Sequence, residues 1–128
     1  MAVKLNIDAI ERDHANLDVT EIVTWLDEHL GQRMTAYVSG IKDQKLVAKW
    51  ASGKHKPHPD SEMRLRRAYY AARLIVEAYS DQTARAWLFG ANTRLDDQAP
   101  ASVLRTAAEV DDLFPIVPAA RAFAAHAA

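Results

Sequence analysis

The sequence contains no cysteine among its 128 residues. Without thiols the chain can form neither disulfides nor a cysteine nucleophile, and their absence argues against a structural zinc site. No apolar run is long enough to span a bilayer. The first residues also lack the basic-then-apolar pattern of a secretory signal. We therefore expect a cytoplasmic protein that does not act in a membrane.

Groups that carry catalysis are scarce as well. The four glycines form no phosphate-binding loop. His55 and His58 straddle a proline and have no third ligand nearby, whereas a catalytic zinc takes about three protein ligands. The aspartate pairs at 96–97 and 111–112 are adjacent in sequence, so the two carboxylates of each pair diverge on a helix. We expect no enzymatic activity, no metal site, no cofactor and no small-molecule substrate.

No segment alternates apolar and polar residues with the period of a β-strand, whereas several have apolar residues three and four positions apart. Apolar residues make up 49% of the chain, which is enough to fill a core. The pattern predicts an all-α fold, as one compact domain or as two small units that share a core. Three regions are expected: an N-terminal arm at 1–17, a helix-turn-helix region at 18–58 and a second helical region at 59–128.

Local signals predict where several helices begin and end. Asp18 and Glu21 have the spacing of a capping box, and Gly31 permits the helix Val19–Leu30 to end. The longest helix is expected from about residue 60 to 79, capped by Asp60 or Ser61. Shorter helices are expected at residues 81–88, from 100 through 104 and at 109–125. The arm is expected to be irregular, apart from a turn of helix at 7–13.

The long helix carries an apolar stripe with Tyr69 and Tyr79 on it, so both are expected in the core. Tyr70 points away from that stripe and is expected at a contact surface. Phe114 is also expected in the core. The tryptophans at 25, 50 and 87 each lie on an apolar helical stripe, which favours a core role over base stacking.

The net charge of −1 conceals an uneven distribution. The formal charge is −5 for residues 1–30, +7 for residues 31–75 and −3 for residues 76–128. A basic middle part between acidic ends is typical of a surface that binds a polyanion. Ordinary solvated helix faces would account for the charge alone equally well.

The basic part contains the stretch QRMTAYVSGIKDQKLVAKWASGKHK at residues 32–56. We interpret it as two short helices around a tight Ser39-Gly40 turn, followed by a basic loop. In the second helix, Val47 and Trp50 belong to an apolar side, and Asp43 is expected to cap its N-terminus. A small helix edged with amides and lysines suits the major groove of DNA.

The predicted DNA contacts fall into two classes. Four residues of the second helix are expected at base edges: Gln44 suits adenine, Lys45 or Lys49 suits guanine or phosphate, and Ala48 suits a thymine methyl. The other contacts are expected at phosphates, and they are Gln32, Lys42, Lys54, His55 and Lys56.

Residues 32–53 resemble the helix-turn-helix of the Xre, or phage-repressor-like, family. The residues that carry the resemblance are Gln32, Ala36, Gly40, Val47, Trp50 and Gly53. The turn between Gly40 and Val47 is one residue longer than is usual there. The resemblance therefore leaves open which base each side chain of the second helix contacts.

The second half resembles the toxin-binding domain of Xre/MbcA/ParS-type antitoxins. The features involved are the Tyr-rich long helix, Ala86-Trp87-Leu88, the Asn92…Leu95 loop, Pro100-Ala101-x-x-Leu104 and Arg121-Ala122-Phe123. Thr106-Ala107 stands where a glycine is often found in that family.

This resemblance implies a DNA-binding antitoxin that represses its own operon through double-stranded operator DNA. Its partner would be a RES-type toxin that degrades NAD, and the C-terminal segment would block the toxin's NAD pocket. The residues implied for toxin contact are Arg121, Ala122, Ala124, Ala125, His126, Ala127 and Ala128. The alternative is a stand-alone or phage-type repressor without a toxin. A homodimer is expected in either case, because helix-turn-helix proteins usually bind paired half-sites.

The C-terminal segment after Phe114 is unusually apolar for a chain end. Two interpretations stay open for it. It can pack on the domain as a final helix, or its last residues can enter a partner's cleft. Both can hold at once.

Overall fold

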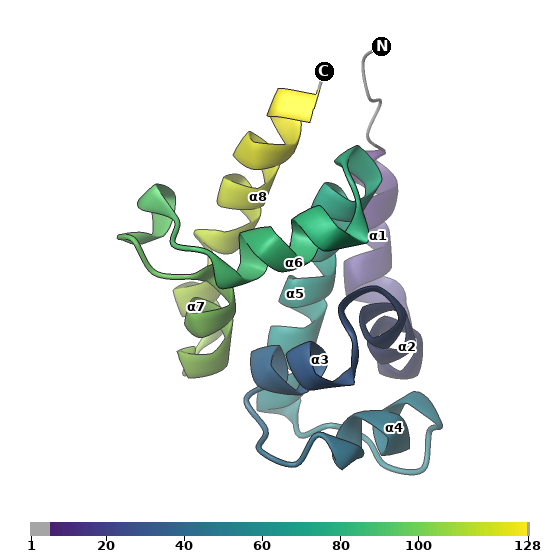
Figure 1. The fold of residues 1–128 in the computed structure, drawn as a ribbon. Helices are drawn as coiled ribbons and strands as arrows, with labels where there is room; N and C mark the ends of the chain where they lie inside the picture. Colours follow the sequence, from purple (N-terminus) through teal and green to yellow (C-terminus); the bar gives the residue numbers. More distant parts are fainter. Residues whose placement is uncertain (1–5, 128) are drawn as a thin grey trace.

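The computed structural model describes residues 6–127, and it confirms the predicted all-α fold. The first five residues of the predicted arm and Ala128 lie outside this range. The described part contains eight α-helices and three short 3₁₀-helices (Figure 1). In chain order they are α1 (Ile7–Asn16), α2 (Val19–Leu30), α3 (Gln32–Ser39), α4 (Lys45–Ala51), α5 (Pro59–Ala78), α6 (Asp81–Phe89), η1 (Thr93–Leu95), α7 (Pro100–Thr106), η2 (Val110–Leu113), α8 (Ile116–Ala124) and η3 (Ala125–Ala127).

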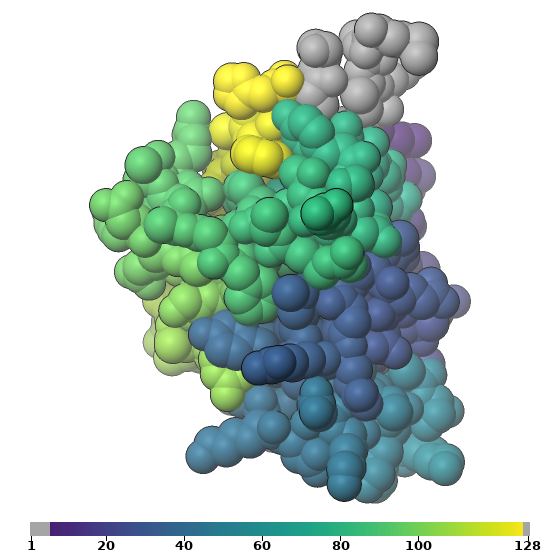
Figure 2. Space-filling model, viewed as in Figure 1, coloured from purple at the N-terminus to yellow at the C-terminus, as the bar shows by residue number. Residues whose placement is uncertain are grey.

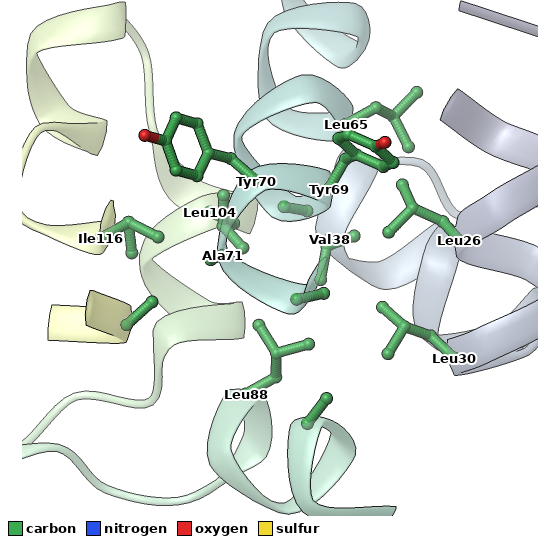
Figure 3. Close-up of a cluster of buried hydrophobic side chains, with 14 of the residues drawn as sticks. Leu26, Leu30, Val38, Leu65, Tyr69, Tyr70, Ala71, Leu88, Leu104 and Ile116 are labelled. Carbon is green, nitrogen blue, oxygen red and sulfur yellow. The ribbon is translucent and has the colours of Figure 1, made fainter. Parts of the chain in front are cut away.

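Helix α5 is the central element, and its side chains pack in two directions. Tyr69 points toward α2, whereas Tyr70 points toward α8 on the opposite side (Figure 3). Both rings are buried, at 2% and 3% exposure. The prediction that Tyr70 lies at a contact surface is therefore wrong, because α8 covers the second side of the helix. One continuous core results, which extends from Ile10 to Ala124.

Residues Ile7–Asn16 form one regular helix, so the turn of helix predicted at 7–13 is present and extends to Asn16, where irregular structure was predicted. Asn6 caps α1 by accepting a hydrogen bond from the N–H of Ala9 at 3.1 Å. Only Ile10 of this helix is buried, so its apolar pattern is weak. Charged groups of α5 hold it instead: Arg73 pairs with Asp13, and Arg66 donates to the carbonyls of His14 and Leu17.

Arg73 also donates to Glu77 and to the hydroxyl of Tyr69. Burial by itself would lower the pKa of this guanidinium, but the hydrogen bonds to Asp13, Glu77 and Tyr69 outweigh that effect and raise it. The charge of Arg73 is thus committed to the contact between α1 and α5.

Two helix starts agree with the predicted chemistry and one does not. Asp18 caps α2 by accepting from the Thr20 N–H at 2.8 Å, a bond that lowers the pKa of the Asp18 carboxyl. Pro100 occupies the first turn of α7 as predicted. For α5, however, the cap is His58 and not Asp60 or Ser61. Pro59 takes the first helical position, so the preceding residue becomes the cap, and its Nδ1 accepts from the Asp60 N–H at 3.1 Å.

Helix α8 packs along α5, which agrees with the interpretation of a final packed helix. Its inward stripe begins with Leu113 and continues through Ile116, Val117 and Ala120. This register leaves Phe114 on the outer side, 59% exposed, so its predicted core position is wrong. Tyr79 is also more exposed than predicted, at 41%, because it follows the last turn of α5.

No helix in the described part of the chain has the length and apolar character needed to cross a membrane.

Candidate nucleic-acid interface

Helix α4 lies at one end of the molecule and presents one side to solvent (Figures 1 and 2). Its inner side holds Val47 and Trp50, which are 0% and 4% exposed and pack toward α2 and α3. Burial of a valine and a tryptophan fixes which side faces outward, since rotating so short a helix would expose both. The prediction of two helices around the Ser39-Gly40 turn is thereby confirmed.

The residues predicted at base edges share the outer side of this region. Gln44, Lys45, Ala48 and Lys49 are all exposed. Those predicted at phosphates lie around them: Lys42 is exposed in the preceding loop, and Lys54, His55 and Lys56 are exposed in the following one. Gln32 is half-buried at the first position of α3. The structure thus gathers the predicted lysines around one helix.

Backbone and cap contacts hold both ends of α4. Before the helix, the Asp43 carboxylate accepts from the Lys45 N–H at 3.0 Å, as expected of a cap. After the helix, the N–H groups of Lys54 and His55 both donate to the carbonyl of Lys49, at 3.0 and 3.3 Å. Gly53 permits this reversal with a φ of 80°. The basic loop therefore folds back onto the end of α4.

The basic residues of the middle part serve two different purposes. The four arginines of α5 are partly buried, and at least three of them bind groups within the fold. The lysines at 42, 45, 49, 54 and 56 are exposed and form no ion pair with any residue from 6 to 127. Asp43 is the one acidic residue between positions 40 and 58, and it is used as a cap. The exposed lysines without ion pairs therefore cover a narrower surface than the +7 block, and that surface is centred on α4.

Two residues of α5 brace the turn between α3 and α4. Ser61 Oγ and Arg64 Nη1 both donate to the carbonyl of Ser39, at 3.0 and 3.2 Å. Arg64 Nη2 continues to the carbonyl of Ala107, at 2.7 Å, so one guanidinium joins the turn to the segment after α7. Gly40 has a φ of 89°, and a Cβ there would lie 2.7 Å from Arg64 Nη1. Two reasons thus favour glycine at this position: the left-handed backbone conformation, and the closeness of the Arg64 side chain to where a Cβ would lie.

Helix α7 contributes a second brace to the same turn. Arg105 Nη1 donates to the carbonyls of Tyr37 and Ile41, at 2.9 and 3.2 Å, and its guanidinium lies 4.7 Å from the centroid of the Tyr37 ring. Neither Arg64 nor Arg105 was singled out from the sequence. Both are distant in sequence from the carbonyls that they bind, so no local spacing could have identified them.

The residues implied for toxin contact lie on and after α8, but they do not share one surface. Arg121, Ala125 and His126 are exposed, and Ala122 is half-buried. Ala124 is 3% exposed and packs inward, which an inserted tail would not require. Ala127 is described only in its backbone, and Ala128 lies outside the described residues.

Arg121 is held in place by Tyr70 of α5. Its Nη2 donates to the Tyr70 hydroxyl at 2.6 Å, and its guanidinium lies 5.8 Å from the centroid of that ring. No carboxylate in the described chain pairs with it. The charge of Arg121 is positioned but not neutralised within the fold.

A groove of about 320 Å³ lies between the end of α6, the loop after it and α8. Trp87 belongs to its wall, together with the loop at 91–94 and the side chains of Ala122, Phe123 and His126. The end of α6 and the loop after it therefore meet α8 at one concave surface. Three of the five features on which the resemblance of the second half rests contribute residues to it: Trp87, the Asn92…Leu95 loop and Ala122-Phe123.

His55 and His58 do not act as a pair, because His58 Nδ1 accepts the hydrogen bond that caps α5. Within residues 6–127, no three side chains of metal-binding type come together. Comparison of the chain with protein-family models, with curated proteins and with solved structures finds no match.

Proposed function

We propose that this chain is a binding protein, not an enzyme, and that it recognises double-stranded DNA in the cytoplasm through α4. The observation that carries the proposal is the exposed side of that helix. Amide and lysine side chains project from it, the unpaired lysines surround it, and the buried Val47 and Trp50 fix its orientation. A short exposed helix with these groups fits the major groove.

The expected contacts divide between base edges and phosphates. Gln44 suits an adenine edge and Ala48 a thymine methyl, while Lys45 and Lys49 suit guanine or phosphate. The lysines of the two flanking loops and Gln32 hold the backbone. The first turn of α3 has no side-chain cap, so its N–H groups can also face a phosphate.

Lys49→Glu tests this proposal. The substitution places a carboxylate toward the phosphates, so DNA affinity should fall by at least about tenfold, with a smaller slope of log affinity against log salt. The measurement is a fluorescence titration of promoter DNA at several salt concentrations. Because Lys49 is exposed and unpaired, the melting temperature should hardly change.

Arg12→Glu, an equal charge reversal on the exposed side of α1, serves as the control and should leave DNA affinity near that of the parent chain. Equal effects of the two variants would contradict the proposal.

We further propose that the second half binds a partner protein and that the chain is an antitoxin of the Xre/MbcA/ParS type. Its partner would be a RES-type, NAD-degrading toxin whose NAD pocket the C-terminal segment blocks. The support is the convergence of the three resembling stretches on the groove at Trp87 and Phe123. If no toxin exists, the chain is a stand-alone repressor of the same DNA-binding type.

Ala122→Arg tests the antitoxin proposal. A deletion of residues 115–128 would remove Ile116 and Ala120 from the core and unfold the chain, so a substitution in the groove is the sharper test. The variant should fail to inhibit NAD cleavage by the toxin encoded next to it, and it should keep its affinity for DNA. Ala15→Arg on the exposed side of α1 is the matched control. Normal inhibition by Ala122→Arg, or a neighbouring gene product that neither binds nor is toxic, would contradict the proposal.

A further inference from the structure

A larger groove, of about 760 Å³, lies between the helix-turn-helix and the second half of the chain. Its apolar part contains two aromatic rings, Tyr37 of α3 and Phe89 of α6, whose centroids are 5.5 Å apart. These rings are 37% and 39% exposed, although each has a large apolar surface. The residues of α3 and α6 meet on the face shown in Figure 2. Lys42 and Gln44 of this groove are also proposed DNA contacts, but neither those contacts nor the groove at Trp87 accounts for the two exposed rings.

The charges around this groove are all positive. Arg33, Lys42 and Arg105 belong to its lining. None of the three forms an ion pair with a described residue. Arg105 is bound to carbonyls, which leaves its charge uncompensated. An apolar groove with such a rim fits a segment that combines apolar anchors with carboxylates.

The chain itself carries a segment of this kind at residues 109–114, which we name the acidic knob. Two of its three large apolar side chains, Val110 and Phe114, are 46% and 59% exposed, whereas Leu113 is buried in the core of its own chain. Asp111 lies between Val110 and Phe114 in sequence and is also exposed. A capping box between Glu109 and Asp112 holds the backbone of η2, so the knob is formed before it meets a partner. None of these residues lines the groove of its own chain.

We propose that the groove receives the acidic knob of a second copy of this chain. Apolar anchors on the knob match exposed rings in the groove, and its carboxylates match the three cations of the rim. The position of α7 makes the exchange reciprocal: Arg105 of that helix lines the groove, and the knob begins only a few residues later. Two surfaces that are this close can both be used about one two-fold axis, which gives a closed dimer and not a filament.

This dimer forms without DNA, so the proposal stands or falls separately from DNA binding. It nevertheless bears on the arrangement of the two recognition helices. Lys42 and Gln44 line the groove and lie directly before α4. A knob seated there fixes one α4 relative to the other, and so the separation of the half-sites that they reach.

Charge reversal at one pair tests the interface, with the full chain studied by sedimentation equilibrium. The parent chain should dimerise. Arg33→Glu places a carboxylate opposite Asp111 at both contacts, and Asp111→Lys places an ammonium opposite Arg33. Each variant alone should therefore raise the dimer dissociation constant by at least about tenfold, because like charges are brought together twice.

An equimolar mixture of the two variants provides the decisive measurement. In a mixed dimer the two introduced charges meet at one contact, and the native Arg33–Asp111 pair forms at the other. The mixture should thus regain a dissociation constant close to that of the parent chain. Arg12→Glu and Glu28→Lys, which reverse exposed charges elsewhere, should dimerise normally. Phe114→Ser tests the apolar anchor without any change of charge, and it should also weaken the dimer.

Circular dichroism at a concentration where the parent chain is monomeric should show an unchanged melting temperature for each variant, since all the substituted side chains are exposed. Three results would overturn the proposal. The first is a parent chain that is monomeric at every concentration, which would leave the groove to a different protein. The second is a dimer that neither the charge reversals nor Phe114→Ser weakens. The third is a mixture that stays monomeric although both single variants fold.

Discussion

Replacing Arg64 with alanine is expected to lower the free energy of unfolding by about 2–4 kcal/mol. The guanidinium donates to the carbonyls of Ser39 and Ala107, which belong to opposite halves of the chain. A hydrogen bond from a charged group contributes about 1.5–3 kcal/mol, and a buried carbonyl left without a donor adds a penalty. The loss should stay below the full sum for two such hydrogen bonds, for two reasons. Ser61 still donates to Ser39, and the Arg64 Nε has no partner within the described residues.

The change can be measured by urea unfolding followed by circular dichroism. Arg12→Ala is the matched control, since that arginine is exposed and forms no described ion pair. It should cost less than about 0.5 kcal/mol. Arg64→Lys should fall between the two, because an ammonium keeps the charge but cannot bridge both carbonyls with the same planar fork. If Arg64→Ala were no more destabilising than Arg12→Ala, the brace would not contribute to stability.

Loss of the brace should also weaken DNA binding beyond the effect of unfolding. The carbonyl of Ser39 immediately precedes Gly40, whose left-handed conformation directs the chain from α3 into α4. Three side chains from distant parts of the chain brace this turn: Ser61, Arg64 and Arg105. A variant in which both arginines are replaced loses two of the three. The combined variant should therefore lose DNA affinity under conditions in which it remains folded.

The helices that were predictable from the sequence are those whose ends are encoded locally. Asp18 and Gly31 bound α2 because a carboxylate suits a helix start and a glycine suits its end. Pro100 likewise stands at the first turn of α7. In such cases the residue acts on its own backbone, so its neighbours in sequence carry the whole signal.

The errors arise where a distant segment decides the outcome. Tyr70 is buried because α8 covers the second side of α5, and Phe114 is exposed because Leu113 takes the inward position. Only a turn of helix α1 was predicted, because Arg73 and Arg66 of α5 hold this helix, and not an apolar stripe of its own. None of these contacts is visible as a spacing.

The same distinction applies to the candidate interface. The lysines of α4 were predictable because their exposure follows from the apolar positions on the same short helix. The arginines of α5 have the same charge, and composition placed them in the same basic block. Their partners are carbonyls and carboxylates brought close by the fold, so only the structure separates their role from that of the lysines. The meeting of Trp87, the loop at 91–94 and the side chains of Ala122, Phe123 and His126 at one groove was equally invisible.

Replacing Leu104 with alanine is expected to destabilise both halves of the chain together, by about 2–5 kcal/mol. Leu104 of α7 is fully buried, and it lies near Ala71 of α5 in Figure 3. Because α7 packs against α3, α5 and α6, a cavity at this site borders the helix-turn-helix as well as the second half. The core is continuous, so neither half retains its packing when the other opens.

Native-state hydrogen exchange separates a shared core from two independent units. The slowest-exchanging amides of α2 and α6 should lose equal opening free energies in Leu104→Ala, because both exchange only through global unfolding. Val103→Ala removes two methyl groups from a half-buried neighbour on the same helix and should cost only about 1 kcal/mol. If α6 lost protection while α2 kept it, residues 59–127 would unfold as a separate unit. Equal losses would mean that the candidate DNA-binding surface and the groove at Trp87 belong to one cooperative structure, so that a partner bound at either surface stabilises the other.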